Sequence, residues 1–106
     1  MEIKEGMYVR FKTLSDQVKI GQIKEIDNII YNLDNNEVTS DKYIMKAGNK
    51  IGDVVETGDI AVMLAYGLPI FKQISESDLL EIKFGNYEVI NIMSKEQFEK
   101  DSYKVV

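Results

Sequence analysis

The side chains with the strongest potential for chemistry are carboxylates in the first half of the chain. This acidic cluster consists of Asp27, Asp34, Glu37 and Asp41. Carboxylates at hairpin tips reach into solvent and their fields add, so the cluster could bind a cation or imitate nucleic-acid phosphates toward another protein. A solvated turn that keeps the protein soluble is the simpler interpretation. A calcium loop starting at Asp34 is excluded, because its sixth and twelfth positions hold Thr39 and Met45 instead of glycine and glutamate.

The chain contains neither cysteine nor histidine. Their absence removes thiolate nucleophiles, disulfides, the commonest general base and the commonest transition-metal ligand. Asp78, Glu81 and Glu88 could act as a general acid and base, but their spacing is equally that of exposed charges on a strand face. We therefore predict a protein that is not an enzyme and that holds no metal or other cofactor.

A second candidate surface is the segment 66–71, which combines apolar side chains with a glycine and a proline and carries no charge. An apolar turn of this kind can dock another protein. The alternative is that its aromatic and aliphatic side chains fold back into the core. We predict a protein-binding surface formed by the acidic cluster together with Tyr66, Leu68 and Phe71.

The charge distribution argues against nucleic acid as a partner. The net charge is −5, and residues 25–59 contain most of the acidic excess. A single arginine, Arg10, among scattered lysines does not form the clustered basic footprint that displaces counterions. Tyrosines expected on strands could stack bases, but the basic groove that accompanies such stacking is missing. Those tyrosines are Tyr8, Tyr31 and Tyr87.

The sequence shows no targeting or membrane segment. Its first residues lack the apolar run of a signal peptide, and the longest uncharged stretch, 60–71, is too short to span a bilayer. With 106 residues, 44% of them hydrophobic and 29% charged, the composition is that of an ordinary globular domain. We expect a cytoplasmic protein that does not contact the membrane.

The two halves of the chain repeat each other at a spacing of about 51 residues. Glu5–Val9 opens the first half and Thr57–Val62 opens the second, and the pattern of residues 27–38 is echoed by residues 78–89. Each half then offers the same alternating apolar face for burial. The sequence predicts one compact domain, 1–106, made of two β subunits of about 1–50 and 51–106.

Local patterns place strands and turns in both halves. Alternation over Met7–Lys12 predicts a half-buried strand, and the phase of the next strand slips after Gly21, which predicts a bulge or bend there. Residues 34–36 predict a hairpin turn. Gly85-Asn86 between two apolar runs predicts a type II′ hairpin that joins strands 80–84 and 87–92.

The C-terminal segment combines a helix signal with a strand signal. Ser94 with Gln97 three residues later forms a capping box, which predicts a short helix. Residues 103–106 predict a closing strand. The fold class is therefore mostly β: two tandem SH3-like small β-barrel units packed together, with one short C-terminal helix.

Several of these segments resemble small uncharacterised proteins of phages and prophages of Gram-positive bacteria (Firmicutes). The likeness is carried by Gly6–Arg10, Val55–Asp59, Ser94–Glu99 and Tyr103–Val105 and spans nearly the whole chain. The resemblance implies an accessory protein of an infected or lysogenic bacterium, where short acidic β proteins often serve as inhibitors or adaptors. It implies no catalytic or binding residues.

These observations lead to two functional expectations. The first is a non-enzymatic module that binds a host or phage protein, in its sharper form an inhibitor of a host defence factor. The alternative is a small-ligand or nucleic-acid binding β-barrel module that uses a cleft between the units, lined by Arg10, Lys12 and tyrosines.

Overall fold

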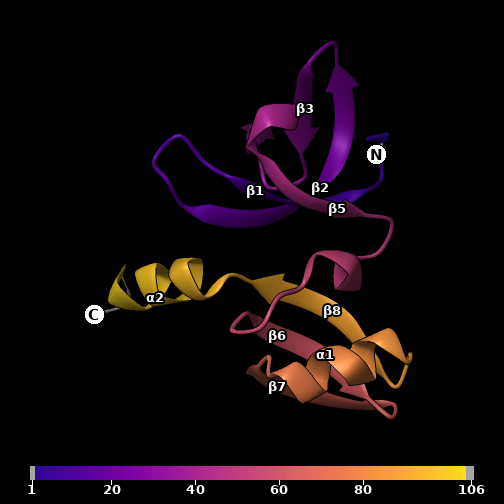
Figure 1. Ribbon diagram of the computed structural model, residues 1–106. Helices are drawn as coiled ribbons and strands as arrows, with labels where there is room; N and C mark the ends of the chain where they lie inside the picture. Colours follow the sequence, from indigo (N-terminus) through magenta and orange to yellow (C-terminus); the bar gives the residue numbers. More distant parts are fainter. Residues whose placement is uncertain (1, 105–106) are drawn as a thin grey trace. The chain divides into compact units, whose positions relative to one another are not determined.

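The computed structural model describes residues 2–104, and the chain divides into two compact units, Met1–Val54 and Val55–Val106 (Figure 1). The first unit is a five-stranded antiparallel sheet of order β4-β3-β2-β1-β5, and the second is a three-stranded antiparallel sheet of order β7-β6-β8. The prediction of a mostly β protein is confirmed. The predicted closed barrels are wrong, because both sheets are open at their edges.

The elements of the first unit are β1 (Tyr8–Lys12), β2 (Val18–Asp27), β3 (Ile30–Leu33), β4 (Val38–Thr39), the 3-10 turn η1 (Asp41–Tyr43), β5 (Ile44–Gly48) and the 3-10 turn η2 (Ile51–Val54). Those of the second unit are β6 (Ile60–Ala65), β7 (Leu68–Gln73), α1 (Glu76–Lys83), β8 (Tyr87–Met93) and α2 (Lys95–Lys104). No helix in the described range is long and apolar enough to cross a bilayer.

A glycine bulge opens the first unit. Gly6 has φ +89°, its N–H donates to the Ile23 carbonyl at 2.8 Å, and the Ile23 N–H donates to the Met7 carbonyl at 2.8 Å. Two residues thus face one across the β1–β2 pair, with glycine in the left-handed position, which is the arrangement of a G1 bulge. Only glycine adopts that φ without strain.

The second unit opens with the same bulge. Gly58 has φ +96°, its N–H donates to the Ile74 carbonyl at 2.8 Å, and the Ile74 N–H donates to the Asp59 carbonyl at 2.8 Å. The similarity of residues 5–9 and 57–62 therefore encodes one backbone hydrogen-bond pattern used twice.

The duplication extends over three strands in each unit. Val9 faces Gly21 and Ala47 across β1, and its counterpart Ala61 faces Lys72 and Ile92 across β6. The pairing register shifts between Arg10 and Phe11 in the first unit and between the equivalent residues, Val62 and Met63, in the second. The order β2-β1-β5 is thus repeated as β7-β6-β8, with the same bulges.

Equivalent strands also supply the cores. The core of the first unit consists of Val9, Phe11, Ile23, Tyr31 and Leu33. The buried apolar residues of the second unit are Val55, Ala61, Met63, Ile74, Val89 and Ile92.

The repeat is interrupted after the second strand of each unit, where the first unit has β3 and β4 and the second has α1. Residues 80–84, predicted as a strand, lie in helix α1 and at its C-cap, so the echo of residues 27–38 in residues 78–89 is wrong. The Ser75 hydroxyl caps the helix by accepting the Asp78 N–H, and the Asp78 carboxylate accepts the Ser75 N–H. This reciprocal capping fixes the helix start and outweighs the strand-like alternation of Leu80, Ile82 and Phe84.

The predicted type II′ hairpin at Gly85-Asn86 is also wrong. The Gly85 N–H donates to the Ile82 carbonyl at 3.1 Å, and the Asn86 N–H donates to the Glu81 carbonyl at 3.0 Å. These bonds form a Schellman C-cap, in which Gly85 takes φ +86°. The positive φ that a type II′ turn needs from glycine is the one that a helix C-cap needs.

The other turn predictions have mixed outcomes. The hairpin turn at residues 34–36 is confirmed, with Asn36 at φ +65° between β3 and β4. The bend predicted at Gly21 is wrong: Gly21 pairs regularly with Val9, and the irregularity of β2 lies between Ile23 and Glu25, where β2 pairs with β3.

The capped C-terminal helix is confirmed. The Ser94 hydroxyl accepts the Gln97 N–H at 3.1 Å, and α2 runs from Lys95 to Lys104. The predicted closing strand is wrong for residues 103 and 104, which are helical, and residues 105 and 106 lie outside the described residues.

Candidate protein-binding surfaces

Two members of the acidic cluster are engaged by groups of their own unit. The Asp34 carboxylate accepts the Gln22 N–H at 3.1 Å, so it caps the exposed side of β2. The Glu37 carboxylate forms an ion pair with the Lys19 ammonium. Their charges are therefore partly used in holding the β3–β4 hairpin against β2.

The other two members differ from each other. Asp41, the first residue of η1, accepts the hydroxyl proton of Tyr31. That hydrogen bond, followed by burial of the ring and the negative charge of Asp41, raises the pKa of the Tyr31 hydroxyl above its ordinary value. Asp27 is exposed at the end of β2. The cluster is a set of separate carboxylates along one hairpin region, of which Glu37 is half-buried and the other three are exposed. The described residues include no group of three or more side chains suited to hold a metal ion.

An open groove of about 670 Å³ lies in the first unit, between the β1–β2 loop and the β3–β4 hairpin. Its apolar lining is Leu14, Ile30, Val38 and Tyr43, and its charged lining is Lys12 and Glu37. Leu14 is 90% exposed and Val38 is 54% exposed. The sequence signal for this groove is the isolated leucine in the polar loop 13–16, which is not among the predicted site residues.

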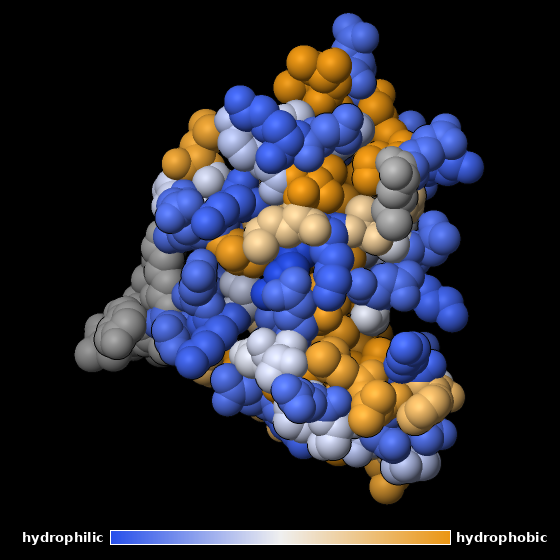
Figure 2. All heavy atoms as spheres, in the orientation of Figure 1, coloured by the Kyte–Doolittle hydropathy of each residue, from blue (hydrophilic) through white to orange (hydrophobic). Residues whose placement is uncertain are grey.

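Apolar surface also reaches solvent elsewhere in this unit. Ile29 is 75% exposed in the turn between β2 and β3. Figure 2 shows apolar atoms at the tip of this hairpin, at the top of the view, next to hydrophilic ones. The acidic hairpin region therefore combines carboxylates with uncovered aliphatic side chains.

The apolar segment of the second unit is exposed instead of folded into the core. Tyr66 is 70%, Leu68 is 68% and Phe71 is 67% exposed. The Tyr66 hydroxyl donates to the Glu81 carboxylate, and this hydrogen bond, followed by burial and charge, raises the pKa of Tyr66. Phe71 lies on β7 opposite Val62 of β6, so both side chains share one face of the sheet.

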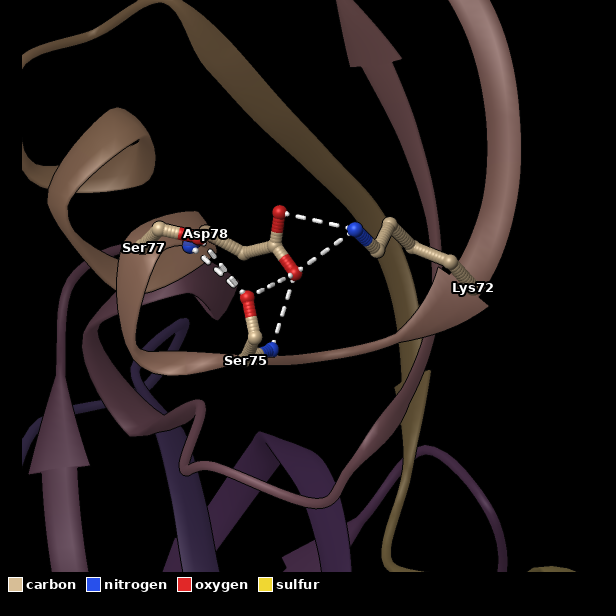
Figure 3. Close-up of polar contacts among 4 residues, drawn as sticks. All are labelled: Lys72, Ser75, Ser77 and Asp78. Carbon is tan, nitrogen blue, oxygen red and sulfur yellow. Dashed lines mark hydrogen bonds and ion pairs between the residues drawn. The ribbon is translucent and has the colours of Figure 1, made fainter.

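The carboxylates considered as an acid and base pair have structural partners. Asp78 is buried and accepts the Ser75 N–H at 2.8 Å and the Ser75 hydroxyl at 2.8 Å, and its carboxylate pairs with the Lys72 ammonium at 3.0 Å (Figure 3). Burial alone would raise the pKa of Asp78, but the Ser75 N–H, the Lys72 ammonium and the Ser75 hydroxyl together hold the pKa below its ordinary value. Glu81 binds Tyr66, and Glu88 is exposed on β8.

Arg10 does not line a surface pocket. It is buried, and a guanidinium nitrogen donates to the Val54 carbonyl at 3.2 Å, which ties β1 to η2. Of the two basic residues considered for a ligand site, only Lys12 lines the groove of the first unit, where Tyr43 is also found.

Fold and surfaces define a class: a small acidic antiparallel β protein of two related units, each with uncovered apolar side chains. Comparison of the chain with protein-family models, with curated proteins and with solved structures gave no match.

Proposed function

We propose that this protein is a non-enzymatic protein-binding module and that the groove of the first unit receives a segment of another protein. The observation that carries the proposal is the open groove whose apolar wall, Leu14, Ile30 and Val38, stands in solvent. Covering one large aliphatic side chain completely contributes about 1.5–3 kcal/mol. A partner with an apolar anchor would gain this energy from side chains that contribute little to the core.

The charge around the groove selects the partner. Residues 25–41 contain Glu25 and the acidic cluster and no lysine or arginine. Lys19 pairs with Glu37, while Asp27, Asp34 and Asp41 are exposed. Such a field speeds the association of a positively charged partner and makes its binding salt-sensitive. The preferred partner is therefore a basic segment with an apolar anchor residue.

In a phage or prophage setting, a module with these properties serves as an accessory protein in the cytoplasm of the bacterial host. A more specific form of the proposal is that the protein is an inhibitor that occupies the nucleic-acid-binding face of a host defence factor. The carboxylates of residues 27–41 would then stand where phosphates bind. The exposure of Asp27, Asp34 and Asp41 supports this version.

The test is affinity capture from host lysate with the tagged full chain at low and high salt, followed by mass spectrometry. We compare a groove variant, Leu14→Ser with Val38→Ser, with a matched control, Ile29→Ser, which changes an exposed aliphatic side chain outside the groove. The expected result is one stoichiometric protein that is lost at high salt and with the groove variant, and retained with the control.

A further variant replaces all members of the acidic cluster by the corresponding amides. Loss of capture at low salt would support the electrostatic part of the proposal. Capture that is unchanged in the groove variant, or recovery of nucleic acid alone, would overturn the proposal, provided that circular dichroism shows each variant folded.

A further inference from the structure

We propose that β7 is a self-association edge: two copies of the chain pair through their β7 strands, antiparallel, and join the two sheets of their second units into one continuous sheet. The site lies in the second unit and is independent of the groove proposed above.

The other edge strands carry devices that prevent pairing with a further strand. β4 has two residues, β5 pairs with β1 through a register shift and carries Lys46, and β8 pairs with β6 through a register shift and carries Glu88. Short strands, bulges, charges and prolines are the usual protection of sheet edges, and of these β7 carries Pro69 and Lys72. β7 has six residues, LPIFKQ, and its pairing with β6 shows no register shift. Its one charge, Lys72, is neutralised by Asp78 at 3.0 Å.

The duplication shows which backbone groups of β7 face outward. In the first unit the N–H and the carbonyl of Gln22 point away from β1. The Gln22 N–H donates to the Asp34 carboxylate at 3.1 Å, and the Gln22 carbonyl accepts the Asp34 N–H at 3.0 Å. Gln73 is the equivalent residue, since it faces Ile60 as Gln22 faces Tyr8.

The second unit has α1 in place of the hairpin that supplies Asp34. The outer edge of β7 is therefore open, whereas β3 covers the equivalent edge of β2 in the first unit. Because outward and inward groups alternate along an antiparallel strand, Pro69 and Phe71 share the outward orientation of Gln73. Pro69 has no N–H to donate, so it stands at a position where no bond to β6 is lost.

One register of two β7 strands fits these groups. With Phe71 opposite Phe71 of the second copy, the two residues exchange both bonds of a hydrogen-bonded pair, and each Gln73 N–H meets a Pro69 carbonyl. Lys72 then faces Ile70, whereas a register with Phe71 opposite Gln73 would set Lys72 against Lys72. Each phenyl ring lies beside Val62 on the same face, so an apolar row crosses the two-fold axis.

The area is sufficient for a weak dimer. Phe71 and Leu68 are 67% and 68% exposed. An aromatic side chain buries about 150–250 Å², so the exposed two thirds of Phe71 and of Leu68 offer roughly 250 Å² per copy, to which the outward atoms of the six-residue strand add. Two copies would bury less than about 1,200 Å² in total, which is the range of small, transient interfaces. We therefore expect a weak dimer, with a dissociation constant of about micromolar size or higher.

The experiment is sedimentation velocity of the full chain from about 1 to 500 µM, a range that brackets a micromolar dissociation constant. We compare wild type with Phe71→Lys, which places a charge at the centre of the edge, and with Phe84→Lys, a matched change at a phenylalanine that is 70% exposed beyond α1. Wild type and Phe84→Lys are expected to reach the dimer, and Phe71→Lys is expected to shift the dissociation constant upward by at least about tenfold.

A second measurement fixes the register. The chain has no cysteine, and facing residues of a hydrogen-bonded antiparallel pair have Cα atoms about 5.5 Å apart, within the disulfide range. Phe71→Cys is expected to form a covalent dimer under mild oxidation, and Phe84→Cys is not. A wild type that stays monomeric throughout, or equal cross-linking of both cysteine variants, would overturn the proposal. A monomeric wild type whose capture of a lysate protein depends on Phe71 would overturn it as well, and would assign the edge to a strand of that protein.

Discussion

Replacing Asp78 by asparagine tests how the second unit holds α1 against its sheet. The Asp78 carboxylate accepts two bonds from Ser75, both at 2.8 Å, and pairs with Lys72 at 3.0 Å. Asparagine preserves the shape and one acceptor but removes the charge. Hydrogen bonds to charged groups contribute about 1.5–3 kcal/mol each and neutral ones about 0.5–1.5 kcal/mol. The Lys72 side chain is 43% exposed, so its pair adds about 0.5 kcal/mol after screening. The expected loss is about 2–3 kcal/mol.

Two companion variants separate the contributions. Ser75→Ala removes the hydroxyl of the N-cap and is expected to cost about 1 kcal/mol. Lys72→Met preserves the capping bonds and is expected to cost about 0.5 kcal/mol. The assay is urea unfolding monitored by circular dichroism, with hydrogen exchange of the α1 peptide to localise the loss to the second unit. Equal losses for Lys72→Met and Asp78→Asn would mean that the ion pair, and not the capping bonds, supplies the stability.

The pH dependence gives a second test of the same site. The folded pKa of Asp78 lies below its unfolded value, so its stabilisation is complete above the unfolded pKa of about 3.9 and is lost as pH falls through the folded pKa. The difference in unfolding free energy between wild type and Asp78→Asn should therefore be constant near neutral pH and shrink below about pH 4. A constant difference down to pH 2 would mean that the charge of Asp78 is not the source of the stability.

Three further predictions concern backbone geometry and a tyrosine. Gly6→Ala and Gly58→Ala should each lower the free energy of unfolding in urea by about 1–2 kcal/mol, because both positions need a positive φ. The added Cβ meets nothing within 4 Å at either position, so clearly unequal losses would contradict the equivalence of the two bulges. Gly48→Ala should cost more, because its Cβ would lie 2.3 Å from the Asp53 Cβ, and a Tm close to wild type would disprove that contact. The hydrogen bond to Asp41 raises the folded pKa of Tyr31 above its unfolded value of 10.0, so the stability from this bond is present below the unfolded pKa and is lost as pH rises through the folded pKa. Tyr31→Phe should remove this alkaline loss when the free energy of unfolding is measured against pH.

The sequence predicted best where a residue has one backbone role. Gly6 and Gly58 marked two identical strand entries, because a left-handed position tolerates few residues other than glycine. Ser94 marked the start of α2, because a hydroxyl before an acidic turn satisfies orphan N–H groups. These signals are local and do not depend on what packs around them.

The sequence failed where two structures share a signal. Leu80, Ile82 and Phe84 alternate as in a strand, and Gly85 fits a hairpin as well as a helix C-cap. The helix is decided by the Ser75–Asp78 capping box, in which each side chain bonds the backbone N–H of the other residue. This signal is local, but the strand-like alternation of the residues that follow it conceals it.

The candidate site shows the same division. Tyr66, Leu68 and Phe71 were predicted to be available to a partner, and they are exposed, but that they lie on and beside an uncovered edge follows only from the strand order β7-β6-β8. The groove between the β1–β2 loop and the β3–β4 hairpin was not predicted, because its walls come from segments about 20 residues apart that a pattern search treats separately.

The duplicated frame explains why the two units present different surfaces. Bulges and register are the same in both, yet Arg10, tied to the Val54 carbonyl, has the exposed Val62 as its counterpart. The segments between the repeated strands differ as well, with β3 and β4 in the first unit and α1 in the second. In the first unit the β3–β4 hairpin covers the edge of β2 and borders the groove. The second unit has α1 at this place and leaves β7 open, so the same frame carries the two separate interaction surfaces that we propose.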